Sequence, residues 1–125
     1  MTLKLLAGSM LAVTILAGCE TIEPETLEQA GARAMNACSG AIRRSNEAGN
    51  YGYSLSDCQC VAGRITTPLW SSENSSYTGD PMPLADAQTI ANALETAPTM
   101  AEALSTARAN VSVPTSNSIN TCFAK

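Results

Sequence analysis

Five cysteines in a chain of 125 residues are the feature that most constrains this fold. Cysteines pair two by two in disulfides, so an odd number leaves one whose role must be different. The chain contains no histidine, which excludes Ser-His and Cys-His catalysis and zinc sites that use histidine ligands. The length allows one small domain rather than two.

The N-terminal segment explains the unpaired cysteine. Lys4 is followed by apolar and small residues from Leu5 to Gly18, a pattern typical of a secretory signal peptide and too short for a membrane-spanning helix, which needs about 20 apolar residues. The residues Leu16-Ala17-Gly18-Cys19 resemble the lipobox of bacterial lipoproteins. In that family the cysteine is acylated and the preceding peptide is removed. The resemblance implies a signal peptide over residues 1–18 and lipidation of Cys19.

The same resemblance predicts where the protein lies. Two or three acyl chains such as palmitate on Cys19 attach a protein to a membrane almost permanently, since each buried methylene contributes about 0.8 kcal/mol. Glu20 follows the cysteine; in the enterobacterial sorting rule an Asp there favours the inner membrane, so Glu indicates the outer membrane. We therefore expect a cell-envelope lipoprotein on the outer membrane, facing the periplasm, with residues 19–24 as a lipidated tether.

Four cysteines remain for pairing: Cys38, Cys58, Cys60 and Cys122. An exported location favours disulfides over free thiols. A bridge between Cys58 and Cys60 is disfavoured, because side chains two residues apart on a helix point about 200° apart around its axis. Cys38–Cys58 with Cys60–Cys122, or Cys38–Cys60 with Cys58–Cys122, both stay open, and we slightly prefer the first. Either pairing fastens the C-terminal tail.

The part after Gly18 is acidic and poor in large apolar residues. All eleven acidic residues and six of the seven basic residues lie there, giving a net charge of −5. Nucleic-acid binding needs a basic face, so no nucleic-acid partner is expected. Only 22 of the 107 residues are large apolar or aromatic ones, which predicts a thin core in which cross-links matter.

Apolar spacing and capping residues predict a small all-α domain of three to four helices over residues 25–125. Ser54 with Asp57, and Thr99 with Glu102, form capping-box patterns. Proline and small polar residues predict an irregular loop over residues 68–83 and an irregular tail over 111–125, until Cys122 and Phe123 dock. The expected helices run from about Glu25 to Ala48, from Ser54 to about Thr66, from Leu84 to before Pro98, and from Thr99 through Ala107.

Four of the five aromatic residues lie in two expected loops: Tyr51, Tyr53, Trp70 and Tyr77. Tyrosine and tryptophan are enriched in binding hot spots, so these residues are candidates for an interaction surface. The alternative interpretation, which we prefer, is that they cover a core short of large side chains.

No pattern indicates catalysis. Acidic residues in or near the two loops, Glu47, Asp57, Glu73 and Asp80, form no recognisable motif, and no catalytic or metal-binding residue is assigned. Cys58-Gln59-Cys60 could serve thiol-redox or soft-metal chemistry, but two structural half-cystines are the simpler interpretation. We expect no enzyme, no cofactor beyond the covalent lipid, and a binding or structural role with a protein or other envelope partner. The alternatives are a redox or metal protein, or an entry-exclusion or inhibitor lipoprotein.

Overall fold

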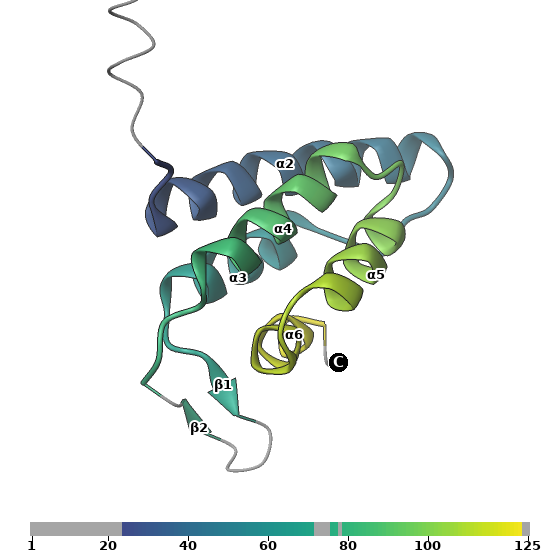
Figure 1. Ribbon diagram of the computed structural model, residues 1–125. Helices are drawn as coiled ribbons and strands as arrows, with labels where there is room; N and C mark the ends of the chain where they lie inside the picture. Colours follow the sequence, from purple (N-terminus) through teal and green to yellow (C-terminus); the bar gives the residue numbers. More distant parts are fainter. Residues whose placement is uncertain (1–23, 72–75, 78, 124–125) are drawn as a thin grey trace, which may run out of the picture.

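The computed structural model describes residues 24–71, 76–77 and 79–123. The signal peptide, Cys19 and most of the tether lie outside these residues. The described part contains five α-helices and one pair of two-residue strands (Figure 1). In chain order they are α2 (Leu27–Glu47), α3 (Leu55–Thr66), β1 (Trp70–Ser71), β2 (Ser76–Tyr77), α4 (Leu84–Thr96), α5 (Met100–Asn110) and α6 (Val113–Asn120).

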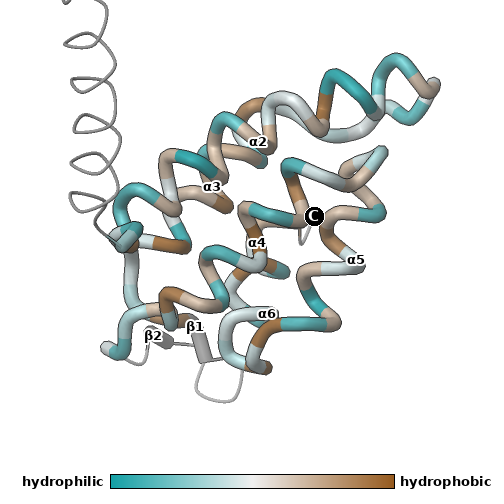
Figure 2. Tube along the Cα trace, turned by 45° about the horizontal axis from the view of Figure 1, so that its top comes forward, coloured by the Kyte–Doolittle hydropathy of each residue, from teal (hydrophilic) through white to brown (hydrophobic). Residues whose placement is uncertain are grey.

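Short side chains allow α2 to act as the centre of the packing. Its buried residues are Ala30, Gly31, Ala34, Cys38, Ala41 and Ser45. Without bulky groups on this face, neighbouring helices can approach closely, and α2 contacts α3, α4 and α5. Figure 2 shows apolar stretches alternating with polar ones along these helices, as expected where one face of each helix is buried.

Local capping sets where the helices begin, as the sequence predicts. The Ser54 N–H donates to Asp57 Oδ2 at 3.0 Å at the start of α3, and Glu102 N–H donates to Thr99 Oγ1 at 3.2 Å at the start of α5. A further capping box at the start of α2 joins Thr26 and Gln29. Each satisfies backbone donors that the first helical turn leaves without partners.

The all-α class and the four expected helices are confirmed, but the predicted C-terminal tail is wrong. Residues Val113–Asn120 form a fifth helix, α6, with Ser112 at its N-cap and Pro114 in its first turn. Proline is tolerated there because the N–H it lacks would have no helical partner. Thr115, Ser118 and Ile119 are buried, so tertiary packing overrides the weak helix propensity of a Ser/Thr/Asn-rich segment.

The expected loop 68–83 also contains regular structure. β1 and β2 pair in antiparallel register, Trp70 opposite Tyr77 and Ser71 opposite Ser76. The prediction that the whole of this segment is irregular is therefore wrong, although the pairing covers only two residues in each strand.

The disulfides follow the preferred pairing. Cys38–Cys58 joins α2 to α3 with Cα atoms 5.5 Å apart. Cys60–Cys122 joins α3 to the turn after α6 with Cα atoms 5.7 Å apart. Cys58 and Cys60 thus reach partners in different elements, as their opposite directions on the helix require.

Candidate interaction surface

The loop between α2 and α3 presents two of the predicted aromatic residues. Gly49 and Gly52 adopt φ values of 84° and 127°, which side-chain-bearing residues rarely adopt, so these glycines allow the chain to turn here. Tyr51 between them is 76% exposed. Tyr53 is half-buried and meets Phe123 edge to face, with ring centroids 6.0 Å apart.

These residues surround a hollow. Tyr51, Gly52, Tyr53 and Phe123 line an open cavity of about 310 Å³. Leu55, which follows the loop as the first residue of α3, is 56% exposed. We call Tyr51, Gly52, Tyr53 and Phe123 the aromatic hollow. Its exposed Tyr51 ring lies beside two aromatic side chains that contact each other. Tyrosine is enriched in binding hot spots, so this surface is a candidate for binding a partner.

Phe123 was predicted to dock but was not assigned to the interaction surface. It follows Cys122, and the turn containing both is held by hydrogen bonds from Cys122 N–H to Ile119 O and from Phe123 N–H to Asn120 O, each 3.0 Å long. In the sequence, the neighbouring Cys122 is the feature that could indicate the position of Phe123, because the disulfide with Cys60 brings this residue close to α3.

The structure places Tyr51 and Tyr53 at the hollow and Trp70 and Tyr77 in the hairpin. The backbones of Trp70 and Tyr77 are directly paired in the hairpin, while their side chains lie outside the described part. The Tyr51 loop precedes α3 and the hairpin follows it. The two ends of this 12-residue helix are about 18 Å apart. A surface shared by all four residues stays a prediction.

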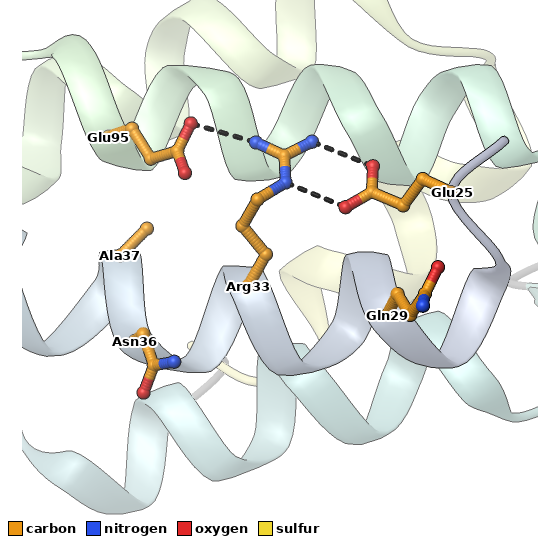
Figure 3. Close-up of a pocket in the computed structure, with 6 residues that line it drawn as sticks. All are labelled: Glu25, Gln29, Arg33, Asn36, Ala37 and Glu95. Carbon is orange, nitrogen blue, oxygen red and sulfur yellow. Dashed lines mark hydrogen bonds and ion pairs between the residues drawn. The ribbon is translucent and has the colours of Figure 1, made fainter. Parts of the chain in front are cut away.

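A second hollow, of about 740 Å³, lies along α2 near α4 and is centred on Arg33 (Figure 3). Arg33 contacts Glu25 with Nε–Oε2 and Nη2–Oε1 distances of 2.8 and 3.0 Å. Arg33 Nη1 lies 2.8 Å from both Asn92 Oδ1 and Glu95 Oε1. No motif revealed this cluster, because its α4 members are about 60 residues away in the chain.

The electrostatics of this cluster are those of a satisfied ion pair. The hydrogen bond from Arg33 lowers the pKa of Glu25 against the opposing effect of desolvation. The reciprocal hydrogen bond raises the pKa of Arg33. Because Nε, Nη1 and Nη2 of Arg33 each already donate to an acceptor, the cluster fixes the start of α2 against α4 and offers little for a ligand.

The remaining candidates have structural surroundings. Asp57 is buried and caps α3, Glu47 and Asp80 are exposed, and Glu73 lies outside the described residues. Cys58 and Cys60 are both in disulfides, so a thiolate pair would require both bridges to be reduced. Among the described residues, no three His, Cys, Asp or Glu side chains gather where they could hold a metal ion.

None of the helices in the described ranges is both long and apolar enough to cross a membrane. No protein-family model, curated protein or solved structure gives a significant match to this chain.

Proposed function

We propose that this protein is a lipoprotein of the cell envelope, anchored through Cys19, and that its helical domain binds a protein partner through the aromatic hollow. The role is non-catalytic. The observation that carries the proposal is the exposure of Tyr51 beside Tyr53 and Phe123 on a loop held by two glycines.

Three further observations support it. The lipobox resemblance at Leu16-Ala17-Gly18-Cys19 predicts export and anchoring, and two disulfides are what an oxidising compartment allows. The position of the hollow also suits a tethered receptor. The tether enters at the start of α2 and the Tyr51 loop follows its end, and 21 helical residues span about 31 Å.

The anchor is tested by cell fractionation. Cys19→Ala should move the protein from the membrane fraction to the soluble fraction, because no acyl chain can then be attached. Thr21→Ala, which changes a neighbouring residue and keeps the cysteine, should stay with the membranes. A Cys19→Ala protein that remains membrane-bound contradicts the lipid anchor.

The partner is tested by photo-crosslinking in the cells that make the protein. A benzoylphenylalanine in place of Tyr51 should give one discrete adduct, and the same probe at Leu55 should give an adduct of the same mass. The probe at Ala32, an exposed residue of α2 far from the loop, should not. Tyr53→Ala should abolish the Tyr51 adduct. An adduct that survives Tyr53→Ala, or the absence of any adduct at Tyr51, contradicts binding at the aromatic hollow.

A further inference from the structure

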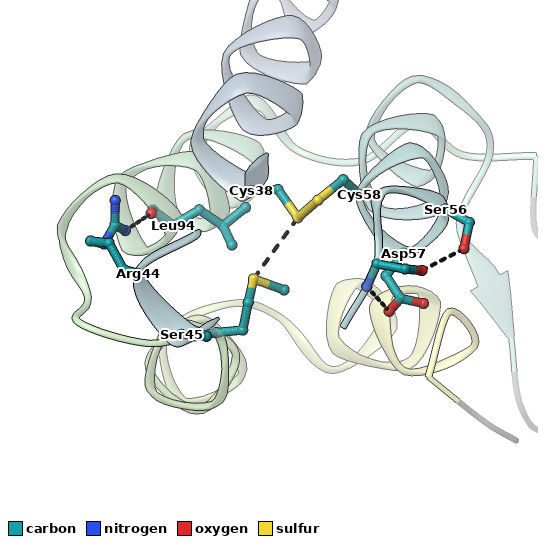
Figure 4. Close-up of a disulfide and its surroundings, with 9 residues drawn as sticks. Cys38, Arg44, Ser45, Ser56, Asp57, Cys58 and Leu94 are labelled. Carbon is teal, nitrogen blue, oxygen red and sulfur yellow. Dashed lines mark hydrogen bonds between the residues drawn. A yellow bond between two sulfur atoms is a disulfide. The ribbon is translucent and has the colours of Figure 1, made fainter. Parts of the chain in front are cut away.

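The two disulfides of this small domain differ sharply in accessibility. Cys38 and Cys58 are both 0% exposed, and Cys38 Sγ lies 3.9 Å from the Met100 sulfur of α5. Figure 4 shows this bridge linking α2 to α3. Cys60 and Cys122 are only half-buried. A disulfide is cleaved when a thiolate reaches one of its sulfur atoms, so an external thiol reaches Cys60–Cys122 first.

The bridges also hold different parts of the fold. Cys38–Cys58 joins two helices that pack together along their length. Cys60–Cys122 instead holds the turn after α6 to α3. The beginning of α6 is fixed independently, because Asp86 Oδ2 accepts hydrogen bonds of 2.7 Å from both Ser112 Oγ and Thr115 Oγ1. Opening the accessible bridge therefore leaves the attachment of α6 to α4 in place.

Beside the bridge, hydrogen bonds from α3 and α5 reach the end of α6 and the residue after it. Arg64 Nε donates to Thr121 Oγ1 at 3.0 Å, and Arg108 Nε donates to Asn120 Oδ1 at 2.7 Å. Phe123, next to Cys122, rests on Tyr53 and forms one wall of the aromatic hollow. Without the covalent link, the 121–123 turn keeps these hydrogen bonds, its backbone bonds to Ile119 and Asn120, and the ring contact of Phe123, which are all non-covalent.

We propose that the Cys60–Cys122 bridge is a thiol-sensitive latch whose opening releases the 121–123 turn from α3 and takes Phe123 away from Tyr53. The reductant is a dithiol. Its thiolate attacks one sulfur of the bridge, the S–S bond breaks, and a mixed disulfide forms. The second thiol of the reductant then displaces the protein sulfur. Two electrons and two protons end on Cys60 and Cys122, and the dithiol becomes a disulfide.

The latch rests on the geometry of the four cysteines. Only its effect on a partner at the aromatic hollow rests on the function proposed above. In the oxidised state Tyr53 and Phe123 form the inner walls of the hollow, and in the reduced state Tyr53 loses the ring that covers it. Thiol chemistry therefore controls the shape of this surface while the buried bridge keeps α2 and α3 together.

The latch is tested by differential alkylation of the full-length protein. Samples reduced with graded dithiothreitol are quenched with acid, labelled with N-ethylmaleimide and mapped by peptide mass spectrometry. Cys60 and Cys122 should reach half-labelling at a dithiothreitol concentration at least about tenfold below that for Cys38 and Cys58, since access governs exchange. Equal labelling of the four cysteines, or earlier labelling of Cys38 and Cys58, overturns the proposal.

Hydrogen exchange on the partly reduced protein tests the release itself. Exchange should increase in residues 119–123 and in the Tyr51 loop, and α2 and α4 should keep their protection. The double variant Cys60→Ser/Cys122→Ser should reproduce this pattern without reductant. The double variant Cys38→Ser/Cys58→Ser should instead lose protection where α2 packs on α3. Loss of protection throughout α2 and α4 on opening Cys60–Cys122 contradicts a local latch.

A crosslinking experiment distinguishes the latch from the proposed binding function. The Tyr51 adduct should weaken in cells that produce Cys60→Ser/Cys122→Ser. If the oxidised wild-type protein gives no adduct while alkylation remains selective, the proposed function fails and the latch stands. If an adduct forms but alkylation is unselective, the latch fails and the proposed function stands.

Discussion

The hydroxyl oxygen of Ser45 accepts a hydrogen bond of 2.7 Å from the backbone N–H of Met100. Ser45 lies near the end of α2 and is 1% exposed, and Met100 is the first residue of α5 and 0% exposed. The first N–H groups of a helix lack partners within the helix. Ser45 therefore satisfies a buried donor of a helix 55 residues further along the chain.

Replacing Ser45 by Ala should destabilise the protein by about 1–3 kcal/mol, because the Met100 N–H would be buried without an acceptor. Urea unfolding followed by circular dichroism measures this loss. The control is Ser105→Ala on the exposed side of α5, which should change stability little. Equal stability of the two variants would show that the Met100 N–H finds another partner.

Local signals were sufficient for most of the helices. The Ser54 and Thr99 caps, the apolar spacing and Pro98 involve residues within a few positions of one another, and these predictions are confirmed. The helix α6 could not be predicted in this way. Its residues have weak helix propensity, and its stability depends on burial of Ile119 and on Asp86, which is 26 residues before Ser112.

The candidate surface could be predicted only in part. Tyr51 and Tyr53 could be identified because four of the five aromatic residues lie in two expected loops, but the place of Phe123 beside them depends on which cysteine pairs with Cys122. Sequence reasoning left two pairings open, so this wall of the hollow could not be assigned. The Arg33 cluster was missed for a similar reason, because α2 and α4 meet only in the folded chain.

Gly31 is expected to be a packing constraint, and Gly63 provides a matched comparison. A Cβ at Gly31 would lie 3.3 Å from Thr66 Cγ2 and 3.5 Å from the Ala62 carbonyl oxygen, whereas one at Gly63 would meet nothing within 4 Å. Gly63→Ala should stabilise the protein by about 0.5–1 kcal/mol through helix propensity.

At Gly31 the same gain in helix propensity is opposed by the close contact of the new methyl group with α3. Gly31→Ala should therefore stabilise the protein less than Gly63→Ala. Gly31→Val should destabilise by about 1–3 kcal/mol through overpacking. Thermal unfolding of the three variants decides the order. A Gly31→Val protein as stable as wild type would mean that α3 can move away from α2 at little cost.

Asp86 should contribute more than an ordinary acidic residue in a first helical turn. Its carboxylate accepts hydrogen bonds from Ser112 and Thr115, and Thr115 is 0% exposed. Glu102 is the first-turn acid of α5 and is exposed, so Glu102→Ala measures the helix-dipole effect, typically about 0.3–1 kcal/mol.

Asp86→Ala should cost about 1–2 kcal/mol more than Glu102→Ala, because hydrogen bonds to a charged group are lost as well. Hydrogen exchange should also rise in α6 for Asp86→Ala alone. Equal losses in the two variants would assign Asp86 only a dipole effect and would leave the start of α6 without its proposed anchor.

The ion pair between Glu25 and Arg33 should make stability depend on acid pH. The hydrogen bond from Arg33 lowers the pKa of Glu25 from its ordinary value of 4.5. The contribution of the ion pair to stability is therefore complete above about pH 4.5, and it is lost as the pH falls through the lowered pKa of Glu25. Both side chains are about a quarter exposed, so solvent screening keeps the effect modest.

Thermal unfolding of wild type and Glu25→Gln between pH 7 and pH 3 tests this relationship. The wild type should have the higher Tm at pH 7, and the difference should shrink towards pH 3, where protonation removes the charge that the substitution removes. In an Arg33→Leu background the same substitution should have little effect at any of these pH values, because the cation that lowers the pKa of Glu25 is gone. A Tm difference that stays constant with pH, or that persists unchanged without Arg33, would assign the stabilisation to contacts of Glu25 other than this ion pair.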